Sequence, residues 1–198
     1  MHRFIIIILI LLLAGCARTA KYYEPIATEG VHIHPGGGCT APSATYHFNV
    51  GEGIKGFISA GVSQDSWGIY YGFTLEKGTK LKMLSPNIKI RSDELENPFT
   101  VKMPQFHMSV YGGLPNRQKG YKKYYQPIEE LSYTGLNEKI DVEYLRNDTF
   151  QSSANINSKN PKSFILNFPA MLANGNQTKI PAIQFNYKEK DYLLTCVQ

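Results

Sequence analysis

The sequence predicts an all-β protein built as an antiparallel β-sandwich, with a partly closed β-barrel as the alternative architecture. Three observations lead to this prediction. The chain contains 13 Tyr and 10 Phe, which favour strands. Its 17 Gly and 11 Pro supply many turns. Short segments in which apolar and polar residues alternate follow one another along the chain, and we expect at most one short helix among them.

The first half of the chain after its N-terminal segment is a series of short candidate strands separated by turn residues. A Pro-Gly-Gly-Gly run at residues 35–38 follows the first of them and matches neither a dinucleotide-binding nor a P-loop pattern. Lys77-Gly78 is typical of a tight hairpin turn. The strands expected here are residues 31–34, 45–50, 54–62, 67–76, 79–84, 88–91, 99–103 and 106–110.

The second half is less regular. Residues 111–136 lose the strand pattern and predict a long exposed loop, in which Pro127 and the acidic residues after it favour one short helix. Residues 147–162 are polar and rich in amides, which predicts another loop. Strands are expected at residues 139–145, 163–168, 183–188 and 192–197, with a hairpin turn at Asn174-Gly175.

The N-terminal segment has the composition of a secretory signal. Met1-His2-Arg3 is a short basic start, and residues 4–12 are all apolar. This run is too short for a membrane-spanning helix, because a hydrocarbon core of about 30 Å requires ~20 helical residues. Leu13-Ala14-Gly15-Cys16 closes the segment and resembles the lipobox of bacterial lipoproteins. The resemblance implies removal of residues 1–15 and a lipid on Cys16, whereas an ordinary signal peptide usually ends in an Ala-x-Ala-like site.

The same resemblance implies a place in the bacterial envelope. Ala17 follows the cysteine, whereas aspartate at that position marks inner-membrane retention in lipoproteins of enteric-type bacteria. We therefore expect anchoring in the outer membrane through the lipid on Cys16. Residues 16–29 are expected to form the lipidated N-terminus and a short tether, and residues 30–198 to form a single β-sandwich domain.

Two cysteines remain once Cys16 is assigned to the lipid. Cys39 and Cys196 lie near the two ends of the domain, and export exposes thiols to an oxidising compartment. We predict a disulfide between them, with two buried free thiols as the alternative. Closing so long a loop is worth nominally ~4–5 kcal/mol.

The charge balance does not favour a nucleic-acid partner, because 21 Lys+Arg against 16 Asp+Glu give only +5 and the chain is expected to be exported. The most distinctive surface feature is a basic, tyrosine-rich run within the expected loop. A lipid head group, a glycan or an acidic protein face in the envelope would complement this run, and a solvated loop is the alternative. Its candidate binding residues are Arg117, Lys119, Tyr121, Lys122, Lys123, Tyr124 and Tyr125.

The sequence predicts neither a metal site nor a cofactor site. His32 and His34 share one face if their segment is a strand, but a zinc or copper site needs three or four ligands. The sequence does not place His47 or His107 beside them, so exposed strand histidines are the simpler interpretation. No catalytic residues are predicted, because the chain contains neither Gly-x-Ser-x-Gly nor His-Glu-x-x-His.

These observations predict a lipid-anchored envelope lipoprotein that acts as a non-catalytic binding or accessory module. The alternative is an envelope hydrolase acting on cell-wall or glycan material, for which location is the only support. A pocket with converging carboxylates or histidines would favour the hydrolase. A flat aromatic or basic exposed face would favour the binding module.

Overall fold

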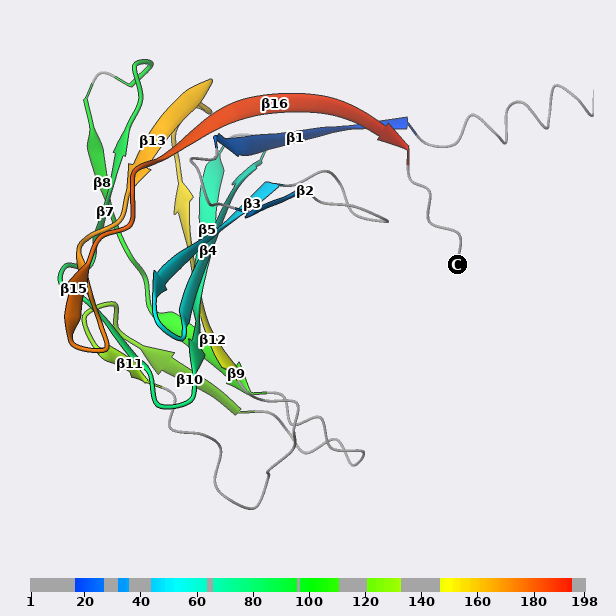
Figure 1. Ribbon diagram of the computed structural model, residues 1–198. Helices are drawn as coiled ribbons and strands as arrows, with labels where there is room; N and C mark the ends of the chain where they lie inside the picture. Colours follow the sequence, from blue (N-terminus) through cyan, green and yellow to red (C-terminus); the bar gives the residue numbers. More distant parts are fainter. Residues whose placement is uncertain are drawn as a thin grey trace, which may run out of the picture.

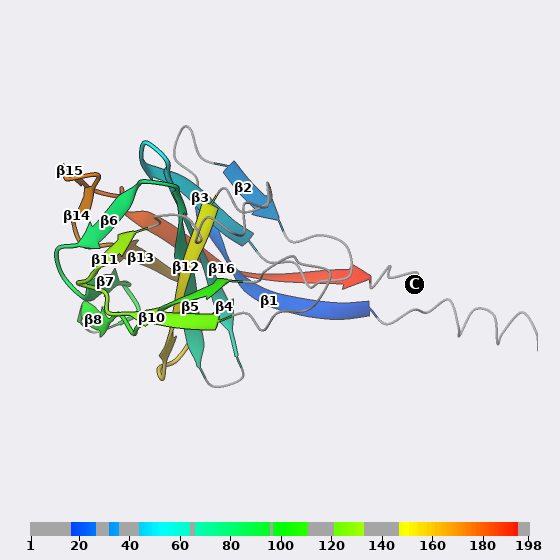
Figure 2. The same ribbon diagram turned by 90° about the horizontal axis from the view of Figure 1, so that it is seen from below.

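The computed structural model describes residues 17–26, 32–35, 44–63, 66–95, 97–110, 121–132 and 147–193. These residues confirm the predicted all-β, antiparallel fold class. A large curled sheet forms a half-barrel, and a second, smaller sheet shares its hydrophobic core (Figure 1, Figure 2). No helix occurs in the described ranges, so the short helix expected after Pro127 is absent.

The large sheet contains twelve of the described strands. Ten of them follow the order β10-β9-β12-β5-β4-β1-β16-β13-β7-β8, while β3 pairs with β4 and β2 pairs with β3. Their bounds are β1 (Ala17–Ile26), β2 (His32–Pro35), β3 (Ala44–Gly51), β4 (Ile54–Val62), β5 (Trp67–Glu76), β7 (Asn87–Arg91), β8 (Phe99–Lys102), β9 (Phe106–Val110), β10 (Tyr121–Tyr125), β12 (Asn147–Ile156), β13 (Ser163–Asn167) and β16 (Ile183–Leu193).

The small sheet has the order β11-β6-β14-β15. Its strands are β6 (Lys80–Met83), β11 (Glu130–Ser132), β14 (Met171–Ala173) and β15 (Asn176–Thr178). The predicted hairpin turn at Asn174-Gly175 is confirmed, since it joins the paired strands β14 and β15. Lys77-Gly78 is a turn, but it joins β5 of the large sheet to β6 of the small sheet, so the hairpin predicted there is wrong. Asn174 and Gly175 have φ angles of 51° and 84°, and Gly78 has a φ of 87°, the left-handed values that such turns require.

The core lies between the two sheets and is strongly aromatic. On β5, every second side chain from Trp67 to Leu75 points inward and is at most 1% exposed. Rings from distant segments meet there, for example Tyr71 with Phe106 and with Phe168, each at a centroid distance of 5.7 Å. The small sheet covers this layer with Leu81, Met83, Leu131, Met171 and Ala173. Burial of these side chains from both sheets in one cluster holds the layers together.

The prediction of a tether at residues 16–29 is wrong for residues 17–26, because these residues form β1. This strand lies inside the sheet, where it pairs with β16 along its full length and with β4 at Tyr22 and Tyr23. Tyr23 is fully buried, and its hydroxyl donates a hydrogen bond to the Pro161 carbonyl at 2.9 Å. The apolar residues of the segment do not alternate regularly with polar ones, and its main partner lies more than 150 residues away in sequence, so local patterning does not reveal the strand.

The prediction of a loop at residues 147–162 is also wrong for Asn147–Ile156, because these residues form β12. This strand pairs residue for residue with β5. Phe150, Ala154 and Ile156 are buried, as is Ser152, whose hydroxyl donates to the Gln105 carbonyl at 3.0 Å. Small inward residues and polar outward residues together hide the alternation that marks a strand.

Three further predictions concern the second half of the chain and the segments outside the described residues. The residues after Gln126 form a turn, because Gln126 and Glu129 exchange two hydrogen bonds of 3.0 Å before β11 begins. Residues 192 and 193 of the strand expected at 192–197 continue β16, which is one strand from Ile183 to Leu193, and residues 194–197 lie outside the described residues. Residues 1–16, Cys39, residues 139–145 and Cys196 lie outside the described residues, so the signal, the lipid site and the disulfide stay predictions.

Candidate functional site

A groove of about 450 Å³ lies on the large sheet, where β1 meets β4 and β5. Because strand side chains alternate, the outward positions here belong to a set different from that of the aromatic core. These positions are small, hydroxylated, amide-bearing or aromatic. The outward lining includes Tyr22, Ser59, Gly61, Tyr70 and Asn155.

Glycine makes the floor of the groove. Gly61 on β4 lies opposite both Tyr22 of β1 and Gly68 of β5. A Cβ added at Gly61 would meet no atom within 4 Å, so the backbone is open to a ligand there. Gly68 is instead covered by Asn155, whose Oδ1 lies 3.0 Å from the position of such a Cβ. The amide of Asn155 and the ring of Tyr22 therefore border an open strip of backbone.

An aromatic strip runs from the groove across the neighbouring strands, formed by Tyr70, Phe57 and His47. The Tyr70 and Phe57 ring centroids are 5.6 Å apart, and those of Phe57 and His47 are 6.2 Å apart. Gly72 permits this arrangement, since a Cβ there would lie 2.5 Å from Cζ of Phe57. Tyr70 is 39% exposed, and partial burial raises the pKa of its hydroxyl. This hydroxyl therefore stays neutral at physiological pH and can both donate and accept hydrogen bonds.

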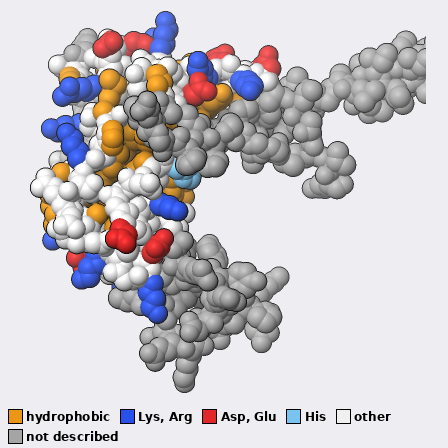
Figure 3. Space-filling model, in the orientation of Figure 1, with side chains coloured by type: hydrophobic (Ala, Val, Ile, Leu, Met, Phe, Trp, Pro, Cys, Tyr) orange, Lys and Arg blue, Asp and Glu red, His pale blue; other side chains and the backbone are white. Residues whose placement is uncertain are grey.

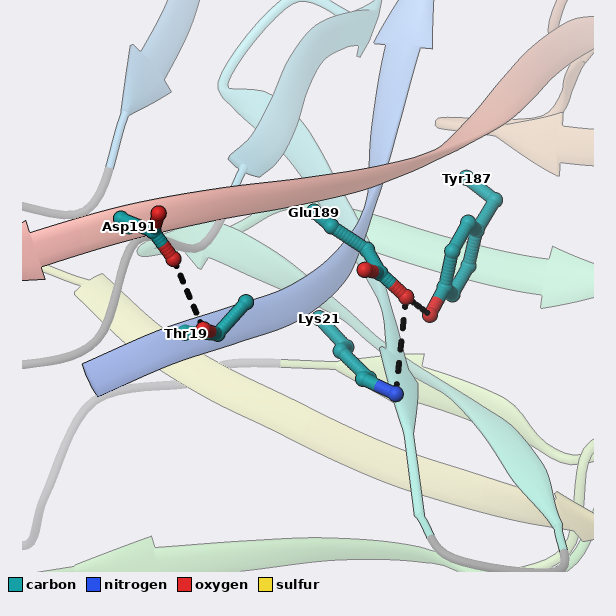
Figure 4. A network of polar contacts seen from close by, with 5 residues as sticks. All are labelled: Thr19, Lys21, Tyr187, Glu189 and Asp191. Carbon is teal, nitrogen blue, oxygen red and sulfur yellow. Dashed lines mark hydrogen bonds and ion pairs between the residues drawn. The ribbon is translucent and has the colours of Figure 1, made fainter.

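The one charged side chain among the described lining residues is Lys21, and it is held by a polar network between β1 and β16 (Figure 4). Its Nζ lies 3.5 Å from Oε1 of Glu189, and the Tyr187 hydroxyl donates to the same oxygen at 2.6 Å. The hydrogen bond from Tyr187, followed by the charge of Lys21, lowers the pKa of Glu189. The same hydrogen bond is the main cause that raises the pKa of Tyr187 to about 12.

Acidic and basic side chains accompany one another along β1 and β16, as the red and blue groups along the upper edge of Figure 3 show. Thr19 donates to Asp191 at 2.7 Å, and Lys188 lies 3.6 Å from Glu24. Cross-strand pairs of this kind each contribute roughly 0.2–1 kcal/mol. They hold the two strands in register beside the groove.

The basic, tyrosine-rich run is not wholly a loop. Tyr121–Tyr125 form β10, which pairs with β9 and stands at one end of the order of described strands, while residues 117–120 lie outside the described residues. Lys123 and Tyr124 are exposed, as predicted, whereas the Tyr125 ring packs against Phe150 at 5.2 Å. Among the described strands, β10 pairs with β9 alone, and lysine at such an edge is a known device against unwanted strand pairing. The charged residues of such a strand hide the apolar alternation from which a strand is predicted.

The histidines are partly brought together. The register of β2 on β3 places His32 opposite His47, whereas His107 lies on β9, which is separated from β3 by β4, β5 and β12. No group of three or more His, Cys, Asp or Glu that could hold a metal ion occurs within the described ranges.

Sequence reasoning missed the groove because it depends on register. Ser59, Tyr70 and Ser153 are consecutive cross-strand neighbours, yet each lies in a separate segment of the chain. Glycine at positions 61 and 68, inside strands, was the available signal, since such glycines often mark a close backbone approach.

Comparison of the chain with protein-family models, with curated proteins and with solved structures finds no match. Among the described residues, no helix is long and apolar enough to cross a membrane. Function therefore has to be inferred from the residues themselves.

Proposed function

We propose that this protein is a lipid-anchored binding module of the bacterial outer membrane, held through Cys16, and that its groove binds a glycan. The observation that carries the ligand class is the lining of the groove. Hydroxyl and amide groups of Ser59, Ser153 and Asn155 surround the partly exposed ring of Tyr70. Such groups hydrogen-bond to ligand hydroxyls, while the ring packs against the apolar face of a sugar.

The paired backbone of the sheet argues against a peptide added as an extra strand. That mode of binding needs a free sheet edge, whose N–H and C=O groups bind the incoming chain. Over the groove, β5 pairs with β4 on one side and with β12 on the other. At β5, side chains must therefore supply the recognition, and half of the side chains in the described lining carry hydroxyl groups.

Charge also favours an uncharged, hydroxyl-rich ligand. Lys21 is the one cation of the described lining, and Glu189 already accompanies it at 3.5 Å. An anionic head group or an acidic protein face would be better matched by several cations. A second candidate site for such an anionic envelope partner is β10, where Lys123 and Tyr124 are exposed.

A hydrolase is the weaker alternative at this groove. Most glycoside hydrolases use two carboxyl groups about 5–9.5 Å apart. The described lining contains no Asp or Glu, and its polar groups are hydroxyls, an amide and one ammonium. This chemistry supports holding a glycan rather than cleaving it.

The ligand and its binding site can be tested together by calorimetric titration with soluble fragments of bacterial envelope glycans. Tyr70→Ala should weaken binding at least about tenfold, because a stacking ring worth ~1.4 kcal/mol changes affinity by that factor. Tyr124→Ala is the matched control, since Tyr124 is also an exposed tyrosine, 56% against 39% for Tyr70. Weaker binding by Tyr124→Ala alone would move the site to β10, and no binding by the unaltered protein would refute the glycan.

The anchor is tested separately by metabolic labelling with a fatty acid. Cys16→Ser should abolish the label and release the protein from detergent-phase fractions, because the lipobox cysteine carries the lipid. A labelled, membrane-bound Cys16→Ser protein would refute the anchor.

A further inference from the structure

Strand β1 begins at the residue directly after the predicted lipid site. Ala17 pairs with Leu193, and the antiparallel register then continues without interruption to Ile26 and Gln184. Among the described residues, only Tyr22 and Tyr23 of β1 also pair with β4, so within this part of the chain residues 17–21 and 189–193 form a two-stranded ribbon. Figures 1 and 2 show this ribbon projecting beyond the rest of the sheet.

Contacts at both ends of the ribbon oppose its separation. An isolated pair of strands is only marginally stable in water. Here the inner end continues into the core, where the ring of Tyr23 contacts Phe164 at a centroid distance of 4.9 Å. Toward the outer end, Lys21 contacts Glu189 and Thr19 contacts Asp191 across the two strands. The ribbon is thus a supported extension of the sheet.

We infer that this ribbon is a stiff membrane mount, and that the groove accordingly meets glycans displayed at the surface of the same membrane. The inference rests on the proposed lipid anchor and glycan groove. From Cys16 to Lys21 the chain advances five residues, or about 17 Å at ~3.3 Å per strand residue. Lys21 already lines the groove, so the near end of the groove lies within about that distance of the lipid-bearing residue whatever the tilt of the ribbon.

A stiff mount has a different functional consequence from a tether. A flexible segment would let the groove search outward from the membrane and turn freely. A hydrogen-bonded ribbon keeps it close to the head groups and restricts its orientation. The ligand that fits this placement is a membrane-surface glycan, and glycans far from the bilayer lie beyond its reach.

Trypsin distinguishes the ribbon from a tether, because cleavage requires the chain to leave its strand and Arg18 and Lys21 both lie within β1. The test uses the full-length lipidated protein in phospholipid vesicles. The control variant carries Ala-Gly-Ser-Lys-Gly-Ser between Cys16 and Ala17, which creates a flexible cleavable site and keeps alanine after the cysteine. We expect the unaltered domain to be released at least tenfold more slowly than that of the control.

Release of the unaltered domain at the rate of the control, with a new N-terminus at Thr19 or Tyr22, would overturn the inference. Two further readouts separate this result from failure of the proposed function. A missing lipid would leave the protein soluble before trypsin is added, and N-terminal sequencing would still test the ribbon. Soluble glycan fragments should bind both proteins equally, since the groove is unchanged, and lost binding in both would count against the groove alone.

Discussion

Replacing Tyr23 tests whether the segment after the lipid site belongs to the folded core. Its side chain is fully buried. The centroid of its ring lies 5.7 Å from that of Trp67, 4.9 Å from that of Phe164 and 5.8 Å from that of Tyr187. Truncating a buried aromatic residue to alanine typically costs about 3–5 kcal/mol. Loss of the hydroxyl also leaves the Pro161 carbonyl without this donor, which adds about 1 kcal/mol or more.

We therefore expect Tyr23→Ala to lower the free energy of unfolding by about 4–6 kcal/mol, a large part of the 5–15 kcal/mol typical of a domain. Tyr23→Phe keeps the ring and should cost about 1–2 kcal/mol. Thr19→Ala, at an exposed position of the same strand, should cost less than about 1 kcal/mol. The assay is urea unfolding of the detergent-solubilised protein, followed by the fluorescence of its single tryptophan, Trp67.

The ordering of the three variants is the critical result. If β1 were a tether, all three would unfold at the urea concentration of the unaltered protein. Equal stability of Tyr23→Ala and Thr19→Ala would thus refute the placement of β1 inside the sheet.

Three further predictions concern other parts of the structure. Gly56→Ala should cost about 1–3 kcal/mol in the same unfolding assay, because a Cβ there would overlap the Phe48 ring, and an unchanged midpoint would contradict this packing. Asn174→Ala should lower the free energy of unfolding by about 1 kcal/mol or more, because it removes two hydrogen bonds. The Asn174 side chain donates from Nδ2 to the Glu52 carbonyl at 3.0 Å, and its Oδ1 accepts from the Lys80 N–H at 2.9 Å. A melting temperature that does not fall would refute this prediction. Ultraviolet titration should show Tyr187 ionising near pH 12, and Glu189→Gln should bring its pKa back toward 10. Because that pKa is raised on folding, its stabilisation is present below pH ~10 and lost toward pH 12, whereas the lowered pKa of Glu189 makes its contribution disappear in acid.

Sequence patterns succeeded where one side of a strand is clearly apolar. β5 is the clearest case, because large inward residues from Trp67 to Leu75 alternate with outward ones. The Asn174-Gly175 turn was equally readable, since few residue pairs adopt its left-handed backbone. Local chemistry determines both features, so no knowledge of distant segments is needed.

The missed elements depend on distant partners instead. β1 gains its place from pairing with β16, and β12 presents Ser152 and Ala154 inward, where large apolar residues would have marked a strand. The groove is harder still to predict from the sequence. Its residues Tyr22, Gly61 and Asn155 become neighbours only through the pairings of β1, β4, β5 and β12. Residue types alone suggested an aromatic surface, but on β10 rather than at the groove.

Glycan binding at the groove is tested most directly by nuclear magnetic resonance of protein labelled in glycine and tyrosine, titrated with soluble glycan fragments. The Gly61 amide and the Tyr22 and Tyr70 rings should shift together as the ligand is added, because all three line the groove. The ring of Tyr124 on β10 should stay unchanged. Shifts confined to Tyr124, or no shift at ligand concentrations that saturate the protein in calorimetry, would contradict the account.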